Sequence, residues 1–235
     1  MPLDPWSREP VLTFEGVGVT TDDGVDLLRS VDLVVRQGAV TVLAGPSGAG
    51  KSTLLRLGNR LELPARGRVY FHGRDAATLD PRDLRRKVGM VFQQAVVFPG
   101  TVRDNLAVAA PDATDDAFAA ALRSCGLGES VLDRVADELS GGEAQRACIA
   151  RTLLTEPEVM LMDEPTSSLD PANRRAVEKL ARGLADEGLG VLWVTHDLGQ
   201  ARRLADELVV LVDGRNADAE ETSRYLAASD DGESA

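Results

Sequence analysis

The chain has 235 residues and a formal net charge of −12, from 26 Lys and Arg against 38 Asp and Glu. Its 43% hydrophobic and 27% charged residues are typical of a globular protein with a sizeable core and exclude a largely disordered chain. The apolar runs are too short to span a bilayer. Two cysteines and two histidines are too few for a disulfide framework or a zinc cluster. The acidic balance disfavours a nucleic-acid partner, because phosphate backbones attract basic surfaces.

The two ends of the chain carry little apolar sequence. The N-terminus, MPLDPWSREP, has neither a basic start nor an apolar stretch, so we predict no secretory signal and a cytoplasmic location. Residues 228–235 are small and acidic and are predicted to form a disordered tail. Cys125 and Cys148 are predicted to be reduced core residues.

Short apolar segments rich in β-branched residues alternate with helical patterns along the chain. Strands are predicted at residues 11–19, 31–35, 40–44, 67–71, 88–92, 159–162, 191–195 and 208–212. Helices are predicted at residues 52–61, 171–187 and 198–206. This alternation indicates an α/β fold around a largely parallel sheet, with antiparallel strands near the N-terminus.

Residues 101–156 differ from the rest of the chain, because they are rich in alanine and show helical periodicity without a convincing strand. We predict that they form an α-helical subdomain inserted into a core made of residues 10–93 and 157–214. No internal repeat or low-complexity linker interrupts the sequence. Residues 1–235 are therefore predicted to form a single domain with one inserted subdomain.

Residues 45–52 read GPSGAGKS between an apolar strand and a helix. This spacing fits G-x-x-x-x-G-K-[ST], in which the glycines let backbone amides converge on a β-phosphate at a helix N-terminus. Lys51 is predicted to contact the β and γ oxygens, and the Ser52 hydroxyl to hold Mg²⁺. The alternative is a glycine-rich turn that fits the pattern by chance, which the strand–loop–helix context disfavours. The predicted nucleotide-binding residues are Gly45, Pro46, Ser47, Gly48, Ala49, Gly50, Lys51, Ser52 and Thr53.

A second buried strand ends in two acidic residues, Asp163 and Glu164, in the segment VMLMDEP. The carboxyl end of a core strand is where ligands bind in open α/β sheets. Asp163 is predicted to belong to the Mg²⁺ shell, and Glu164 to polarise a water that attacks the γ-phosphate. A strand that simply ends in a polar loop is the alternative.

Residues 139–146 read LSGGEAQR, and at this motif the chain resembles the ABC ATPase family, whose signature is LSGGQ or LSGGE. The matching residues are Ser140, Gly141, Gly142 and Glu143. The resemblance covers roughly residues 12–214 and implies a P-loop NTPase core of the ABC type. It also implies a head-to-tail homodimer that sandwiches two ATP molecules, in which each signature motif completes the phosphate-loop site of the other subunit.

Three further motifs follow in the order that the family has them. Gln93 matches the Q-loop glutamine, which is expected to contact Mg²⁺ and the attacking water, with Gln94 as the alternative. Asp170 matches the D-loop aspartate, which is implied to cross the dimer interface. His196 matches the switch histidine, which is implied to contact the γ-phosphate. The implied catalytic residues are Glu164, His196 and Gln93, and the implied Mg²⁺ ligands are Ser52, Gln93 and Asp163.

The chain departs from the family pattern at two places. Thr21 stands where the family usually has an aromatic residue that stacks on adenine. The base is therefore expected to rest on an aliphatic residue, on Phe14 or on Trp6, with looser base selectivity. Residues 215–221, RNADAEE, are more acidic than the usual family ending.

The resemblance implies an ATP-binding and ATP-hydrolysing subunit of an ABC transporter, with ATP and Mg²⁺ as cofactors. The implied partners are two separate membrane-spanning subunits, contacted through the apolar residues 96–102, and a solute-binding protein, without nucleic acid. These partners would hold the chain on the inner face of the cell membrane. The segments LLRLGNRL and LRRKVGMVFQQ resemble the phosphate-importer ATPases and also a group linked to metal or nucleotide-sugar export.

Two other functions compete with transport. A non-transport ABC ATPase of translation or DNA repair is disfavoured, because such proteins generally carry a second cassette, long coiled-coil insertions, zinc modules or basic arms. A small P-loop kinase or another NTPase is disfavoured by the signature motif and by the switch histidine. Transport is therefore the preferred hypothesis.

Overall fold

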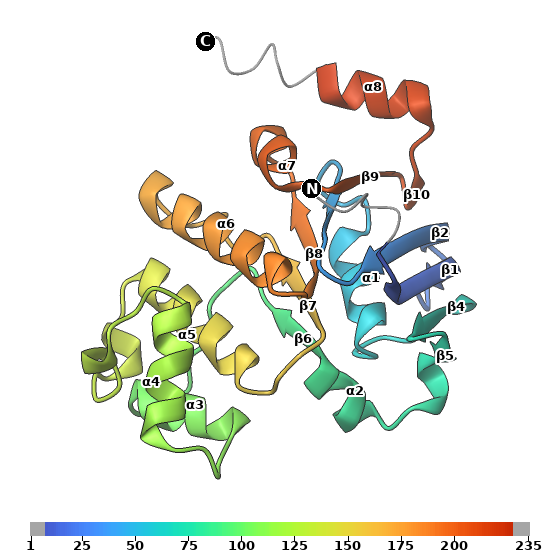
Figure 1. Cartoon of the computed structure of the whole chain (residues 1–235). Helices are drawn as coiled ribbons and strands as arrows, with labels where there is room; N and C mark the ends of the chain where they lie inside the picture. The colour runs from blue at the N-terminus through green and yellow to red at the C-terminus, as the bar shows by residue number, and fades with distance from the viewer. Residues whose placement is uncertain (1–7, 228–235) are drawn as a thin grey trace.

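The computed structural model of the chain describes residues 8–227 (Figure 1). The predicted tail at residues 228–235 and Trp6, one of the candidate contacts of the base, lie outside the described residues. The predicted α/β fold is confirmed, because a parallel central sheet and a smaller antiparallel sheet are both present. Within residues 8–227, no helix combines the length and the apolar character that crossing a bilayer requires.

The central sheet has six strands in the order β10-β9-β3-β8-β7-β6. They are β3 Val40–Ala44, β6 Val88–Val91, β7 Val159–Asp163, β8 Gly190–Thr195, β9 Glu207–Val212 and β10 Arg215–Asn216. All neighbouring pairs are parallel except β9 with β10. Every residue of β3, β7 and β8 is buried, as expected for a parallel sheet that is covered on both faces. The carboxyl ends of these three strands lie side by side at one edge of the sheet.

Three helices flank the central sheet, namely α1 Lys51–Gly58, α6 Pro171–Asp186 and α7 Leu198–Leu204. Successive side chains of a strand point to opposite faces, so the sheet contributes to two hydrophobic clusters. Val42 of β3 belongs to the same cluster as Trp193 and the α6 residue Ala181. Its neighbour Leu43 belongs to the other cluster, together with Leu54 of α1. Consequently α1 lies on one face of the sheet, and α6 and α7 lie on the other.

The antiparallel sheet has the strand order β2-β1-β4-β5. Its strands are β1 Pro10–Thr20, β2 Asp26–Arg36, β4 Arg66–Phe71 and β5 Arg74–Asp75. Leu12 and Phe14 of β1 are buried in the same cluster as α1. The strand β2 begins at Asp26 and not at residue 31 as predicted. The reason is that Ser30 has a φ of 60° beside a register irregularity, which interrupts the alternation of apolar and polar residues.

Between β6 and β7 the chain forms helices that pack against the edge of the central sheet (Figure 1). They are α3 Val102–Ala109, α4 Asp115–Ser124, α5 Gly141–Leu153 and the short 3₁₀ helices Glu129–Val131 and Ala136–Glu138. Leu106, Leu122 and Ile149, one from each α-helix, share a buried cluster with Met160 of β7. This shared core holds the helical part against the sheet.

The structure contains two α-helices that the sequence does not predict, α2 Pro81–Lys87 and α8 Ala219–Ala227, as well as the 3₁₀ turn Ala76–Thr78. The seven residues of α2 are too few for a clear helical period, although Asp80 and Pro81 form a recognisable N-cap and first position. Arg215 pairs with Glu221 of α8 through bonds of 2.7 and 2.6 Å. This ion pair anchors α8 to the end of the central sheet.

Candidate nucleotide-binding and catalytic site

The predicted phosphate loop connects β3 to α1, and its backbone is built on glycines with positive φ. Gly45, Gly48 and Gly50 have φ values of 149°, 81° and 95°, a region that L side chains rarely adopt. A Cβ at Gly45 would come within 2.1 Å of the Leu211 carbonyl oxygen. The loop therefore passes directly against the backbone of β9. It ends at the N-terminus of α1, where the first backbone amides have no acceptor within the helix.

Lys51 is folded against this loop. Its side chain is only 6% exposed, and Nζ donates to the carbonyl oxygens of Gly45 at 2.8 Å and Pro46 at 2.9 Å. Burial lowers the pKa of Lys51, while the charges of Glu164 and Asp163 oppose this shift. The two carbonyls and the two carboxylates thus hold an ammonium group inside the loop, which is suited to an incoming phosphate.

Ser52 and Asp163, predicted as Mg²⁺ ligands, are adjacent although they come from different elements. The Ser52 hydroxyl at the start of α1 donates to Oδ1 of Asp163, at the end of β7, over 3.0 Å. Asp163 is buried, and burial raises the pKa of its carboxyl group. A nearby divalent cation would relieve this cost, because it favours the charged carboxylate. The two oxygen donors suit Mg²⁺, which takes few protein ligands and completes its shell with water and phosphate oxygens.

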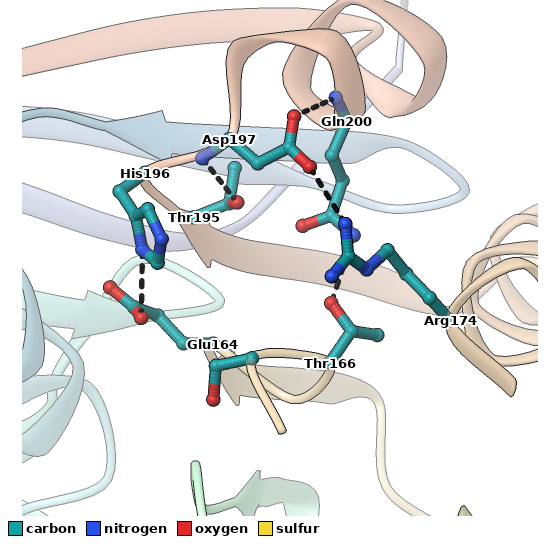
Figure 2. A pocket seen from close by; sticks show the side chains of 8 residues that line it. Glu164, Thr166, Arg174, Thr195, His196, Asp197 and Gln200 are labelled. Carbon is teal, nitrogen blue, oxygen red and sulfur yellow. Dashed lines mark hydrogen bonds and ion pairs between the residues drawn. The ribbon is translucent and has the colours of Figure 1, made fainter. Parts of the chain in front are cut away.

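Two predicted catalytic residues, His196 and Gln93, approach one carboxylate oxygen of the third, Glu164, and Figure 2 shows the contact of His196. The ring Nδ1 of His196 lies 3.0 Å from Oε2 of Glu164. Gln93 Nε2 donates to the same oxygen over 3.4 Å and to Ser167 Oγ over 3.3 Å. Glu164 stands at a φ of 42°, so the chain turns sharply after β7 and directs this side chain toward His196. The geometry therefore unites residues from the ends of β6, β7 and β8.

A small pocket lies beside this cluster, lined by Glu164, Thr166, Ser167, Arg174, Thr195, His196, Asp197 and Gln200 (Figure 2). Its volume of about 60 Å³ holds a few water molecules and not a nucleotide. Asp197 holds the segment that follows β8 in place at the edge of the pocket. Its carboxylate accepts from the backbone amide of Gln200 at 2.9 Å, and its own backbone amide donates to Thr195 Oγ1 at 3.0 Å. His196 is thereby held at the surface with a side chain that is 58% exposed.

The signature motif forms the N-terminus of α5. Ser140 and Glu143 make a reciprocal capping box, and Arg134 donates to Oε1 of Glu143 over 2.7 Å. These bonds lower the pKa of Glu143 to about 2, with the Ser140 backbone bond as the largest cause. The Arg134 guanidinium balances the charge of Glu143, and Gly141 at the start of α5 is exposed whereas Gly142 is buried, so the first turn of the helix can still offer an amide to an anion at Gly141.

The signature motif is remote from the phosphate loop of its own chain. In Figure 1 the helix α5 lies with α3 and α4 at the lower left, whereas α1 lies on the far side of β7 and β8, beside β1 and β2. Asp170, the D-loop aspartate, caps α6 by accepting from the Ala172 and Asn173 amides at 3.0 and 3.1 Å. The structure therefore gathers the phosphate loop, Asp163, Glu164, His196 and Gln93, and leaves the signature motif apart from them.

The position expected to contact adenine lies in the turn between β1 and β2. The Thr21 hydroxyl accepts from the Val25 amide at 3.1 Å. Phe14 is only 1% exposed, so its proposed contact with the base is wrong, because the ring is locked in the core beneath β1. Val25 and Leu27 are 58% and 37% exposed. An aliphatic contact is therefore the alternative that the described residues support.

Thr21→Tyr is expected to tighten ATP binding by roughly twofold to tenfold, the worth of one aromatic stacking contact. The measurement is a calorimetric titration with ATP and with GTP, and we expect the ratio of the two affinities to change. Thr78→Tyr, on an exposed turn of the antiparallel sheet, serves as the matched control. An unchanged affinity for Thr21→Tyr would show that this position does not face the base.

Sequence reasoning missed two residues that contact the site. Ser167 accepts a bond from Gln93, and its position in a turn after Glu164 is the only signal for it. Tyr225 of α8 is half-buried against the core cluster. Burial raises the pKa of Tyr225, whereas a hydrogen bond from the Gly45 backbone lowers it. No local pattern indicates this contact, because it depends on the path of the chain after β10.

A glycine-rich phosphate loop on a parallel strand, with polar residues gathered at the ends of neighbouring strands, indicates a P-loop NTPase, and the signature motif at the start of α5 is typical of the ABC class. The comparison with protein families agrees, since residues 28–167 match the family described as ABC transporter. The chain belongs to the ABC transporter family. It carries the module that binds and hydrolyses ATP in these transporters.

Two relatives indicate how far the sequence similarity extends. Protein STAR1 of Oryza sativa subsp. japonica is 44% identical over 196 residues, which cover 81% of this chain and 57% of STAR1. Phosphate import ATP-binding protein PstB 2 of Natronomonas pharaonis is 39% identical over 227 residues, which cover 89% of this chain and 80% of PstB 2. The chain thus spans less than two thirds of STAR1 and most of PstB 2.

Two solved structures share the fold. The structure of cbiO1 from Clostridium perfringens, part of the ABC transporter complex cbiONQ, has a TM-score of 0.83 and 26% identity, covering 95% of this chain and 94% of cbiO1. The dimeric structure of MJ0796, a bacterial ABC transporter cassette, has a TM-score of 0.80 and 30% identity, covering 88% of this chain and 97% of MJ0796. The likeness therefore includes the helical part as well as both sheets.

Proposed function

We propose that the chain powers solute transport by separate membrane subunits, through a homodimer that hydrolyses two sandwiched MgATP molecules. The observation that carries this proposal is the division of the site within one chain. The phosphate loop, Asp163, Glu164 and His196 lie together, whereas the anion-binding helix start at Ser140 lies in another part of the molecule. A second copy is needed to bring the two halves to one γ-phosphate.

Two kinds of protein group would hold MgATP: positively charged or N–H groups that bind the phosphates, and oxygen atoms that bind the cation. Lys51 and the amides of α1 would bind the phosphates. Ser52, Asp163 and Gln93 would provide oxygens to the cation, which neutralises phosphate charge when bound. Among residues 8–227 no three His, Cys, Asp or Glu side chains cluster as a metal site. This agrees with a cation that obtains most of its ligands from the nucleotide and water.

Glu164 would orient and deprotonate the water that attacks the γ-phosphate. His196, 3.0 Å from its Oε2, would hold that carboxylate and reach the γ-phosphate from the side. Gln93 would couple changes at the nucleotide site to the position of the helices between β6 and β7. This link is supported by Gln145 of α5, which is 2% exposed and donates to the Phe92 carbonyl oxygen at 3.1 Å.

Residues 96–102 would form the contact with the membrane subunits, as expected from their apolar sequence. Val96 and Phe98 are 53% and 41% exposed. Arg151 stacks over the Phe98 ring at 4.7 Å and donates to the Val96 carbonyl oxygen at 2.9 Å. Arg151 thus holds this stretch in place while Val96 and Phe98 face outward, an arrangement suited to a short amphipathic helix of a partner. Val102 was expected to belong to this surface, but it is 1% exposed and packs in the core, so it cannot contribute to the contact. A contact of this kind would keep the chain on the inner face of the membrane.

Complementation between two inactive variants tests the composite site. Ser140→Arg is expected to bind ATP without hydrolysing it, because the bulky cation displaces the signature from the partner's γ-phosphate. Lys51→Ala lacks a functional phosphate loop but retains its signature. Mixing equal amounts should restore about a quarter of the wild-type turnover, because half of the dimers are mixed and each has one intact site. Phosphate release from the mixture is measured, and its absence would contradict the composite site.

A second experiment tests the connection to transport. We expect membrane-spanning proteins to co-purify with the chain in mild detergent, and Phe98→Asp to abolish this without changing ATP affinity. Val108→Asp provides the matched control, because Val108 is a 64% exposed valine of α3 outside residues 96–102. Co-purification of ribosomes or DNA in place of membrane proteins would favour the non-transport ATPase.

A further inference from the structure

Asn173, in the first turn of α6, lies between the signature helix and the D-loop of the same chain. Its Oδ1 accepts from Nη1 of Arg146 at 2.6 Å, and its Nδ2 donates to Oδ2 of Asp170. The amide is thus oriented between a cation on α5 and an anion at the start of α6. Because each end has its own charged partner, the side chain has one preferred orientation.

Steric contacts join the same two motifs. A Cβ at Gly142 would lie 2.4 Å from Cγ of Asn173, so the amide is packed directly on the signature backbone. Leu169 of the D-loop, only 8% exposed, approaches Gly141, where an added Cβ would lie 3.9 Å from its Cδ2. The signature motif and the D-loop are therefore packed against each other through Asn173 and Leu169.

We infer that Asn173 is a positioning residue that joins the signature motif and the D-loop into one unit presented to the ATP of the partner subunit. This inference rests on the proposed dimer, in which both motifs act across the interface. Asn173 itself touches no part of its own phosphate loop in the described contacts. Its loss should consequently impair the partner's site and leave the site of its own chain intact.

Two substitutions at Asn173 remove different subsets of its contacts. Asn173→Ala removes the bonds to Arg146 and Asp170 together with the packing on Gly142. Asn173→Asp retains an acceptor for Arg146 and nearly the same shape, but it places a second carboxylate against Asp170, where the like charges repel. Both variants should therefore release the D-loop, although only the alanine variant also releases the signature helix.

Mixed dimers distinguish a positioning role from a purely structural one, because a structural defect would lower turnover whichever chain carries it. One chain carries Ser140→Arg and supplies the phosphate loop, and the other carries Lys51→Ala and supplies the signature. Adding Asn173→Ala or Asn173→Asp to the Lys51→Ala chain should lower turnover by roughly tenfold to a hundredfold, as for misplaced catalytic groups. The KM for ATP should stay nearly constant. The same substitution in the Ser140→Arg chain should have no effect.

The controls distinguish this inference from the proposed dimer. Without any change at residue 173, the mixture must hydrolyse ATP; failure at this step would overturn the dimer and the inference with it. Lys179→Ala, a substitution on an exposed residue six positions further along α6, should leave turnover unchanged in either chain. Equal losses from both placements of the Asn173 variants, or no loss from either, would overturn the positioning role while the dimer stands.

Discussion

Glu164→Gln is expected to reduce ATP turnover by about 10²-fold to 10⁴-fold, the contribution of a general base, while ATP still binds. The substitution keeps the shape of the side chain and removes the negative charge that orients and deprotonates water. The phosphate loop is untouched, because Lys51 and Ser52 have their own partners in Gly45, Pro46 and Asp163. The measurement is phosphate release under saturating ATP, with binding followed by calorimetry.

The same variant is expected to accumulate as a dimer, because ATP that is bound and not hydrolysed holds both halves of each site together. Size-exclusion chromatography with and without ATP measures this shift. Glu158→Gln is a matched control at the opposite end of β7, where Glu158 pairs on the surface with His72 and Lys87. It should hydrolyse ATP normally. Full hydrolysis by Glu164→Gln would exclude Glu164 as the base.

Lys51→Ala should weaken ATP binding by roughly tenfold to a hundredfold, which corresponds to the 1.5–3 kcal/mol typical of hydrogen bonds to charged groups. No other lysine can replace it, since Lys87 and Lys179 are the only others in the sequence and neither lies at the loop. Folding should survive, because burial already disfavours the charged ammonium. Calorimetric titration with ATP measures the affinity, and circular dichroism monitors the fold.

Lys87→Ala is the matched control for this loss of a lysine. Its ammonium group is 3.3 Å from Glu158 in an exposed ion pair, and exposed pairs contribute little to stability. ATP affinity should therefore remain at the wild-type value. If Lys51→Ala bound ATP as tightly as Lys87→Ala, the phosphate loop would not depend on its lysine and the predicted binding mode would be wrong.

Much of the fold was predictable because strands of a parallel sheet are buried on both faces and appear as short apolar runs. The strand β3 begins and ends at the predicted residues, Val40 and Ala44. Prediction failed where the signal was short or interrupted. The bulge at Ser30 concealed the first part of β2, and α2 has only seven residues, so neither segment is long enough for a clear periodic pattern.

The contacts among the predicted catalytic residues could not be predicted from local sequence either. Glu164 was suggested by its position at the end of a strand, and Gln93 and His196 by the resemblance to the ABC ATPase family. Their meeting at one oxygen depends on contacts across 71 residues for Gln93 and 32 residues for His196. The strand order β8-β7-β6 brings these three ends together. No local pattern encodes that order, because it results from packing of the whole sheet.

The sequence by itself predicted the chemistry of this protein, since glycine spacing, one lysine and two acidic residues at the end of one strand are typical of a phosphate site. Only the tertiary structure decided which groups act together. It buried Phe14 away from the base, placed Tyr225 against the phosphate loop, and set Asn173 between Arg146 and Asp170. These contacts are made by residues distant in sequence, and their geometry follows from how the layers pack.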